Sequence, residues 1–434
     1  MSYAGPTSYA ELNVIKKNRP PVSIKGRTVS FEYFESLYSP MATANLTEID
    51  SGGTSVDRRG QLGTLKDTLP ITGLEDVSFI FENGSGQLNF ASKQRSSHNA
   101  PFKVNGSPTV SQDHNRQLVL LPLISNYGMA NQDIPIFNKY KGRISDSVTK
   151  ILKDQLKVSK YNVEPTVNKD DFIGKGKSPF DLITGLCKKS IPSTNGDPGY
   201  FFYETQDGFN FRSIDSLIKQ VPKEDYVYSG QLNANLDNDE NNFKILSAPI
   251  ISKDQNVLNA LQSGTYSCRY ISTNPYNFET REDVIKLTSK TNLGERQKRL
   301  DVTKFMRTYH HLLDINHLNF VSTDGPGMPD NDPGKWQAKS VMRYNLLHTV
   351  VVEIQVPCNL RLRAGDIIRC DIEKVTQGDK NLGWVNNHQS GKYLILHLCH
   401  HFDPERSYTS MTLVRDTYGL YTGSNTTTQT SILA

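Results

Sequence analysis

Two runs near the C-terminus decide the fold: residues 393–398 (YLILHL) and residues 408–413 (YTSMTL). Each is a short stretch rich in apolar side chains and bounded by polar turn residues, which predicts a β-strand. Two earlier runs, 349–356 (TVVVEIQV) and 366–372 (DIIRCDI), have the same character. We expect these four strands to form one β domain.

A second β-rich region lies near the N-terminus. Residues 28–35 (TVSFEYFE) alternate, which places Val29, Phe31 and Tyr33 on one face of a strand. Further short apolar runs follow up to residue 124, and Asn83-Gly84-Ser85-Gly86 has the chemistry of a hairpin loop. Several short strands separated by turns predict a small antiparallel barrel or sandwich.

The hydrophobic period becomes helical between these regions. A first helix is predicted over residues 144–156 with Ser145 as its N-cap, and a second begins with Ser178 as N-cap and Pro179 in the first turn. Two aromatic runs then flank Gln206-Asp207-Gly208, which predicts a hairpin. We expect a compact α+β domain here.

The fold class is therefore mainly β, with two β domains flanking a smaller α+β domain. The expected division of the chain is an extended arm (1–24), a first β domain (25–140), an α+β middle domain (141–221), a second β domain (222–282 and 339–420), a loop-rich insertion packed near the middle domain (283–338) and a flexible tail (421–434).

Composition limits the classes of function. The 434 residues carry a net charge of only +4, and the cluster Arg296-Gln297-Lys298-Arg299 is most simply a solvated surface, so a dedicated nucleic-acid binder is not indicated. The five cysteines are widely spaced, which argues against a disulfide framework and a zinc site. We expect no signal peptide and no membrane span, hence synthesis in the cytoplasm.

Four local features invite a chemical interpretation. Gly174-Lys175-Gly176-Lys177-Ser178 is similar to a phosphate loop but lacks its spacing, so a flexible loop before a helix is the simpler reading. The carboxylates of Asp237-Asn238-Asp239-Glu240 have no apolar neighbours and are expected to be solvated. Two histidine clusters could hold a metal ion or line an interface: His310, Asp314 and His317 on one face of a helix, or His397, Cys399 and His401 on one face of a strand.

The metal reading of both clusters stays open, although polar packing at a subunit interface is the simpler alternative. No catalytic, cofactor-binding or metal-ligating residue is assigned, and we expect no enzymatic activity.

Several motifs occur together in a recognisable order. They are 31–36 (FEYFES), 178–183 (SPFDLI), 199–204 (GYFFYE), 211–214 (FRSI), 360–366 (LRLRAGD), 390–395 (SGKYLI), 400–402 (HHF) and 408–416 (YTSMTLVRD). Over most of residues 25–418 this series resembles the central baseplate hub family of contractile-tailed, T-even-like phages. The base of type VI secretion VgrG spikes has the same fold.

The resemblance implies a structural role. It implies a homotrimer in which each subunit supplies two tail-tube-like antiparallel barrels, so that three copies present six. Such a ring would join the hexameric tail tube to the trimeric central spike, often lysozyme-bearing in this family, with a lumen for DNA. Other baseplate proteins would also be partners, and the protein would reside in the tail baseplate of the virion after assembly in the host cytoplasm.

Two alternatives remain. The first is the hub of a type VI secretion system or another contractile injection system, because the fold is shared. The second is a tail-associated cell-wall hydrolase, which would need a buried acid or a metal site.

Overall fold

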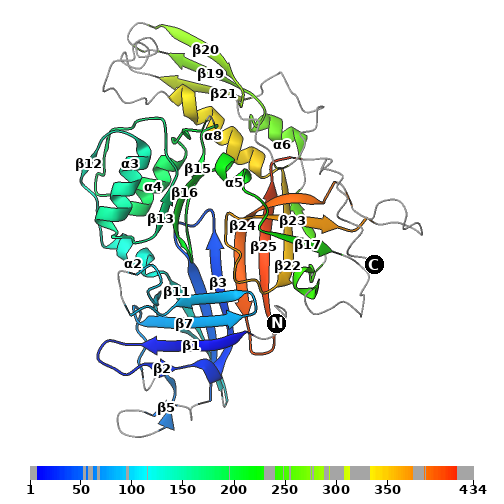
Figure 1. Cartoon of the computed structure of the whole chain (residues 1–434). Helices are drawn as coiled ribbons and strands as arrows, with labels where there is room; N and C mark the ends of the chain where they lie inside the picture. Colours follow the sequence, from blue (N-terminus) through cyan, green and yellow to red (C-terminus); the bar gives the residue numbers. More distant parts are fainter. Residues whose placement is uncertain are drawn as a thin grey trace.

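The computed structural model contains one large sheet that runs through both β-rich parts of the chain, with a helical unit and a small separate sheet beside it (Figure 1). The structure describes residues 7–417 except 52–54, 57–61, 66–68, 94–96, 115, 195, 229–239, 248, 254–255, 274, 276–277, 288–292, 294–306, 313–332, 375–385 and 387.

The first β unit packs its strands around a core of aromatic rings. Its strands are β1 (Ser8–Ile15), β2 (Val22–Ser23), β3 (Thr28–Ser36), β4 (Thr43–Asp50), β7 (Asp76–Asn83), β8 (Gly86–Phe90), β9 (Phe102–Val104), β10 (Thr109–Asp113) and β11 (Arg116–Ile124). Phe31 and Tyr33 are fully buried, and the Phe31 and Phe79 rings lie 4.7 Å apart. Rings in such contact contribute about 0.5–1.5 kcal/mol beyond the burial of their area.

Two predictions about this unit need correction. Val29 does not share the buried face of Phe31, because a β-bulge between Thr28 and Ser30 shifts the alternation by one residue. The segment 1–24 is not simply an arm: its residues 8–15 form β1, which pairs with β7 and buries Leu12 and Val14 in the core.

The second β unit consists of β17 (Glu224–Tyr228), β18 (Ile250–Lys253), β22 (Val350–Pro357), β23 (Ile367–Ile372), β24 (Gly391–Phe402) and β25 (Ser407–Arg415). Its sheet is apolar on both faces at the end that packs on the middle unit. Ile395 and Leu413 face one core, while Leu394 and Val414 pack against the middle of the molecule. The four strands predicted from the sequence are confirmed.

Strand β24 joins the two β units. Its first residues pair with β23, for example Leu394 with Ile367, and its last six pair with β3, from His397–Ser36 to Phe402–Phe31. Twelve residues make β24 long enough to pair with two strands along one edge. The strands in the described part of the chain thus form open, continuous sheets. The prediction of two closed barrels is therefore not confirmed there.

The middle unit is helical on one side and a three-stranded sheet on the other. It contains α2 (Asn126–Gln132), α3 (Ile144–Lys150), a π-helical turn (Ile151–Gln155), α4 (Pro179–Cys187), α5 (Ile214–Ile218), β13 (Tyr161–Val163), β15 (Tyr200–Thr205) and β16 (Gly208–Ser213). The Ser178 cap is confirmed, since its hydroxyl accepts a hydrogen bond from the Asp181 amide. Ser145 is not a cap: α3 begins one residue earlier, and Ser145 is buried inside it.

A third layer covers the other end of the molecule (Figure 1). Strands β19 (Cys268–Thr273), β20 (Thr280–Ile285) and β21 (Arg307–Leu312) form a sheet on which α8 (Pro333–Leu347) packs. The prediction of a loop-rich insertion over 283–338 is wrong for these elements, and the segment 339–347, expected to belong to the second β domain, is helical. Ala338, Met342 and Leu346 are buried at helical spacing.

Buried ion pairs tie these layers together. The Arg343 guanidinium of α8 is fully buried and lies 2.6 Å from Asp215 of α5 and 3.0 Å from Asp416 after β25. Asp416 also accepts the amide of Leu293. One side chain therefore links α8, the middle unit and the end of the second β unit.

Candidate assembly surface

Eight strands from both β units lie side by side in one series: β10-β11-β4-β3-β24-β25-β22-β18. Every neighbouring pair in the series is antiparallel. One face of the series covers the apolar cores, and we call the opposite face the outer face. Because residues directly opposite each other share a face, the register lines up outer side chains in rows.

One row crosses the junction of the two units through Gln355, Ser410, Cys399 and Phe34, and the next runs through Glu353, Thr412, His397 and Ser36. Neighbouring strands add further small polar side chains, namely Thr43, Asn45 and Thr47 of β4. The outer face at the junction is thus mainly neutral and hydrogen-bonding.

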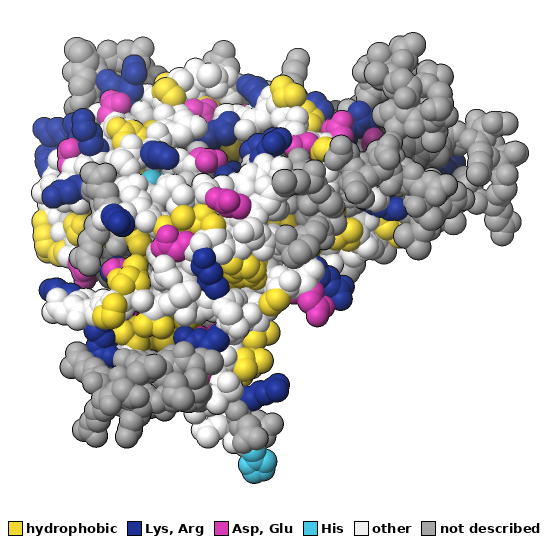
Figure 2. All heavy atoms as spheres, turned by 60° about the horizontal axis from the view of Figure 1, so that its bottom comes forward, with side chains coloured by type: hydrophobic (Ala, Val, Ile, Leu, Met, Phe, Trp, Pro, Cys, Tyr) yellow, Lys and Arg dark blue, Asp and Glu magenta, His cyan; other side chains and the backbone are white. Residues whose placement is uncertain are grey.

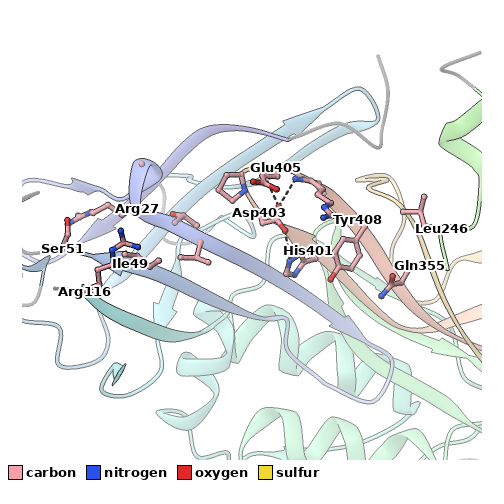
Figure 3. Close-up of a pocket in the computed structure, with 16 residues that line it drawn as sticks. Arg27, Ile49, Ser51, Arg116, Leu246, Gln355, His401, Asp403, Glu405 and Tyr408 are labelled. Atoms are coloured by element: carbon pink, nitrogen blue, oxygen red, sulfur yellow. Dashed lines mark hydrogen bonds and ion pairs between the residues drawn. The ribbon is translucent and has the colours of Figure 1, made fainter. Parts of the chain in front are cut away.

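Two hollows mark the outer face. The larger, of about 1150 Å³, has Arg27, Ile49 and Arg116 on one side and His401 and Tyr408 on the other (Figure 3). A smaller one of about 370 Å³ is lined by His397, Cys399 and their neighbours, and both hollows include Gln355. Both hollows lie along the line where the two units meet.

The predicted strand cluster is present, but its members do not converge. His397, Cys399 and His401 share the outer face of β24. Alternate residues on a strand lie about 7 Å apart, so three in succession cannot reach one ion at bond lengths near 2 Å. Within the described ranges, no group of three or more His, Cys, Asp or Glu side chains is arranged to hold a metal ion.

His401 instead belongs to a polar contact between the units. Its Nδ1 lies 3.3 Å from Glu32 Oε1 on β3, its Nε2 lies 3.5 Å from Asp403 Oδ2, and its ring stacks on Tyr408 with centroids 4.7 Å apart. His397 lies beside the exposed ring of Tyr38, with centroids 6.0 Å apart. These contacts are polar and aromatic packing at the surface.

The second cluster cannot be assessed as a whole. His310 lies on strand β21 and not on a helix, and its Nε2 is 3.1 Å from Thr273 Oγ1. Asp314 and His317 lie outside the described residues, as do Asp237–Asp239 and the cluster at 296–299. The phosphate-loop-like segment is an ordered turn: the amide of Gly176 donates to the carbonyl of Ile136.

Sequence reasoning missed the buried carboxyl groups, and three of them, Glu35, Glu48 and Glu204, have a raised pKa. Burial raises the pKa values of Glu48 and Glu204 to about 7 and raises the pKa of Glu35. Strand alternation places Glu35 and Glu48 on the inward face of their strands, so the sequence contained a signal for their burial. Alternation alone, however, does not distinguish a buried acid from a shift of strand register.

The side chains of these three acids are buried, although Glu35 borders the smaller hollow. Glu204 accepts the amide of Ala42, and Glu35 accepts the amides of Gln206 and Ala364. Glu48 borders a cavity of about 10 Å³, too small for a sugar ring. The carboxyls are part of the internal structure.

On the face shown in Figure 2, Lys and Arg side chains lie scattered among Asp and Glu, and the residues drawn in colour form no continuous basic stripe. Among the described residues no helix is long and apolar enough to cross a membrane.

Searches with family models and among curated proteins find no match. Solved structures do match over nearly the whole chain. The tail protein from Neisseria meningitidis MC58 has a TM-score of 0.52 at 10% identity, covering 95% of this chain and 97% of the other. The 43 kDa tail protein of prophage MuSo2 from Shewanella oneidensis has a TM-score of 0.53 at 10% identity, covering 94% and 98%.

An E. coli component of the type VI secretion system, itself described as similar to bacteriophage T4 tail proteins, matches with a TM-score of 0.42 at 10% identity, covering 94% of this chain and 79% of the other. The matches to the Neisseria and Shewanella tail proteins cover almost all of this chain and of each tail protein, so the similarity concerns the whole architecture and not one module. This protein therefore has the fold of phage tail proteins, the fold that its sequence motifs predicted.

Proposed function

We propose that this protein is the structural baseplate hub subunit of a contractile phage tail, a trimeric adaptor between the tail tube and the central spike. The observation that carries the proposal is the eight-strand antiparallel series that runs through both β units. Each copy would supply two tube-like units, so three copies would form a ring of six that matches a hexameric tube and a trimeric spike.

The parity of the series supports ring formation. Because eight is even and every pair alternates in direction, β10 and β18 run in opposite directions. If copies are related by rotation about a ring axis, β18 of one copy therefore meets β10 of the next as an antiparallel neighbour. A series with an odd number of strands would bring parallel edges together.

The two end strands have room for such pairing. In the described part of the chain, β10 pairs with β11 alone and β18 with β22 alone. Open edges of this kind pair readily with another chain. The outer face beside β10 exposes Ile49, Leu118 and Leu120, and Ile251 is exposed on β18. Apolar side chains next to an open edge support a contact between copies.

The outer face suits a lumen. Around the junction its side chains are mainly small and polar, with the acids Glu32 and Glu353. In the larger hollow, Arg27, Arg116 and Arg406 lie beside Asp403 and Glu405. A passage for DNA should not bind phosphates, and affinity for DNA grows with each lysine or arginine contact. In this proposal the protein is not an enzyme, acts in the virion tail and has tube, spike and other baseplate proteins as partners.

Light scattering after size-exclusion chromatography tests this function. The purified chain alone should have three times its 48.8 kDa mass, and a complex with the spike protein should contain three copies of it. A stable monomer that binds neither tube nor spike protein would contradict the hub assignment.

A further inference from the structure

The middle unit carries a rigid two-stranded ribbon on its outer side, away from the second β unit (Figure 1). Strand β12 (Lys139–Tyr140) pairs with β14 (Phe172–Ile173), with Lys139 opposite Ile173 and Tyr140 opposite Phe172. Tyr140 and Phe172 stack at 5.2 Å and pack on the core of the unit. Lys139 and Ile173 consequently point outward, where Ile173 is 52% exposed.

An exposed phenylalanine stands on the same ribbon. The Phe137 side chain is 69% exposed although its neighbour Ile136 is fully buried. A Cβ placed on Gly176 would lie 3.2 Å from the Phe137 ring, so the ring rests against the Gly176 backbone. An aromatic ring exposed to this degree gains free energy when a partner covers it and removes it from water.

The backbone beneath the ring is fixed by hydrogen bonds and tight packing. The Gly174 amide donates to the Asn138 carbonyl at 3.1 Å, and the Gly176 amide donates to the Ile136 carbonyl at 2.8 Å. Any side chain at Gly174 would overlap the Ile136 carbonyl. The Phe137 ring is therefore presented by a preorganised support, which reduces the entropy lost on binding.

Lysines surround this apolar point. Lys139, Lys141, Lys175 and Lys177 are all exposed, and the described residues offer none of them an ion-pair partner. The nearby Asp171 carboxylate is occupied by the amide of Gly142 at 3.0 Å. The surface thus combines one aromatic anchor, one aliphatic contact and a basic rim.

We propose that this lysine ribbon, formed by Phe137, Ile173 and the four lysines, docks a second protein of the tail that carries an apolar recess ringed by carboxylates. The partner being a tail component rests on the proposed function. Aromatic anchors in desolvated pockets dominate binding energy, while rim charges set association rate and salt dependence. The lysine ribbon has both an exposed aromatic anchor, Phe137, and charged lysines around it.

Protein fits this surface better than nucleic acid. Single-stranded nucleic acid is held by several stacking rings along a basic groove. The ribbon offers a single exposed ring, and the side chain that shares its outward face is the aliphatic Ile173, which gains nothing from a phosphate.

Photo-cross-linking in assembled particles identifies what the ribbon touches. With p-benzoylphenylalanine in place of Phe137, irradiation of purified particles should give one cross-linked partner protein, and mass spectrometry should find the joined peptide to be rich in Asp and Glu. Cross-linking to nucleic acid, to a second copy of this chain, or to nothing at all would overturn the inference.

Variants measure the strength of the contact. Phe137→Ala and the double variant Lys139→Glu/Lys175→Glu should each lower incorporation of the protein into particles about tenfold. The first removes the aromatic anchor, and the second reverses the charge of two rim lysines. Val221→Ala, at an 84% exposed apolar position, and Lys153→Glu are matched controls that should incorporate normally.

The outcomes separate this inference from the hub assignment. Absence of the wild-type protein from particles would refute the proposed function. Normal incorporation of wild type and of all ribbon variants would refute the docking surface alone.

Discussion

The carboxylate of Glu35 on β3 accepts a hydrogen bond from the backbone amide of Ala364, with 3.0 Å between Oε2 and N. Its other oxygen accepts the amide of Gln206 at 2.9 Å and the Tyr33 hydroxyl at 3.0 Å. One buried side chain therefore binds the first β unit, the middle unit and the loop before β23. Arg363 completes the contact through Asp207 at 3.0 Å.

Replacing Glu35 should loosen all three units together. Glu35→Ala leaves the amides of Gln206 and Ala364 without acceptors, each worth about 1–3 kcal/mol when buried, so we expect a loss of about 3–5 kcal/mol. Urea unfolding followed by fluorescence measures it. Glu32→Ala, on the outer face of the same strand, is the control and should cost less than about 1 kcal/mol; equal losses would contradict the role given to Glu35.

Glu48 makes stability depend on pH. Its carboxylate is fully buried and its oxygens have no hydrogen-bond partner among the described residues, and burial raises its pKa from 4.5 to about 7. The folded state therefore keeps the proton between these values while the unfolded state loses it. This contribution to stability is complete below pH 4.5 and is lost as the pH rises through 7.

The variant Glu48→Met isolates that effect. The difference in unfolding free energy between variant and wild type should move in favour of the variant by about 2–3 kcal/mol from pH 4.5 to pH 8. Thermal or urea unfolding at several pH values gives the difference. Parallel pH profiles for the two proteins would show that Glu48 does not titrate in this range.

Arg343 should be far more sensitive than a surface arginine. Removing it in Arg343→Ala leaves the buried carboxylates of Asp215 and Asp416 uncompensated, which we expect to cost about 3–5 kcal/mol. Arg369→Ala breaks the half-exposed pair with Asp371 and should cost about 0–1 kcal/mol. Differential scanning calorimetry compares them, and a small effect at Arg343 would mean that α8 is held mainly by its apolar contacts.

The proposed contact between copies can be trapped chemically. Val110 of β10 and Ile251 of β18 are both exposed and lie on the same face of the series, opposite the core residues Val119 and Val352. In the double variant Val110→Cys/Ile251→Cys, a short bismaleimide should join neighbouring copies into covalent dimers and trimers on a denaturing gel. Each single variant serves as control and should give no trimer. A trimer in solution that is never cross-linked would place the contact between copies elsewhere.

The elements that were predicted correctly have local sequence signals. Ser178 and Pro179 predicted the start of α4, and Asp207-Gly208 predicted the hairpin of β15 and β16, because capping and turn chemistry depend on neighbouring residues. Helix α8 was missed because its polar first half hides the spacing of Ala338, Met342 and Leu346. The pairing of β24 with β3 joins residues more than 360 positions apart, and no local pattern encodes it.

On the candidate surface, too, local features could be predicted from the sequence and long-range contacts could not. The shared face of His397, Cys399 and His401 could be predicted from strand alternation, whereas the position of Glu32 opposite His401 depends on the long-range register. The buried state of Glu35 likewise depends on contacts from Gln206 and Ala364, which lie far along the chain.

Electron microscopy of the purified ring, with class averages viewed along its axis, tests the central claim most directly. Two tube-like units per chain predict a particle with threefold symmetry and six alternating lobes around an open centre. Averages with three lobes, or with any symmetry other than threefold, would contradict it.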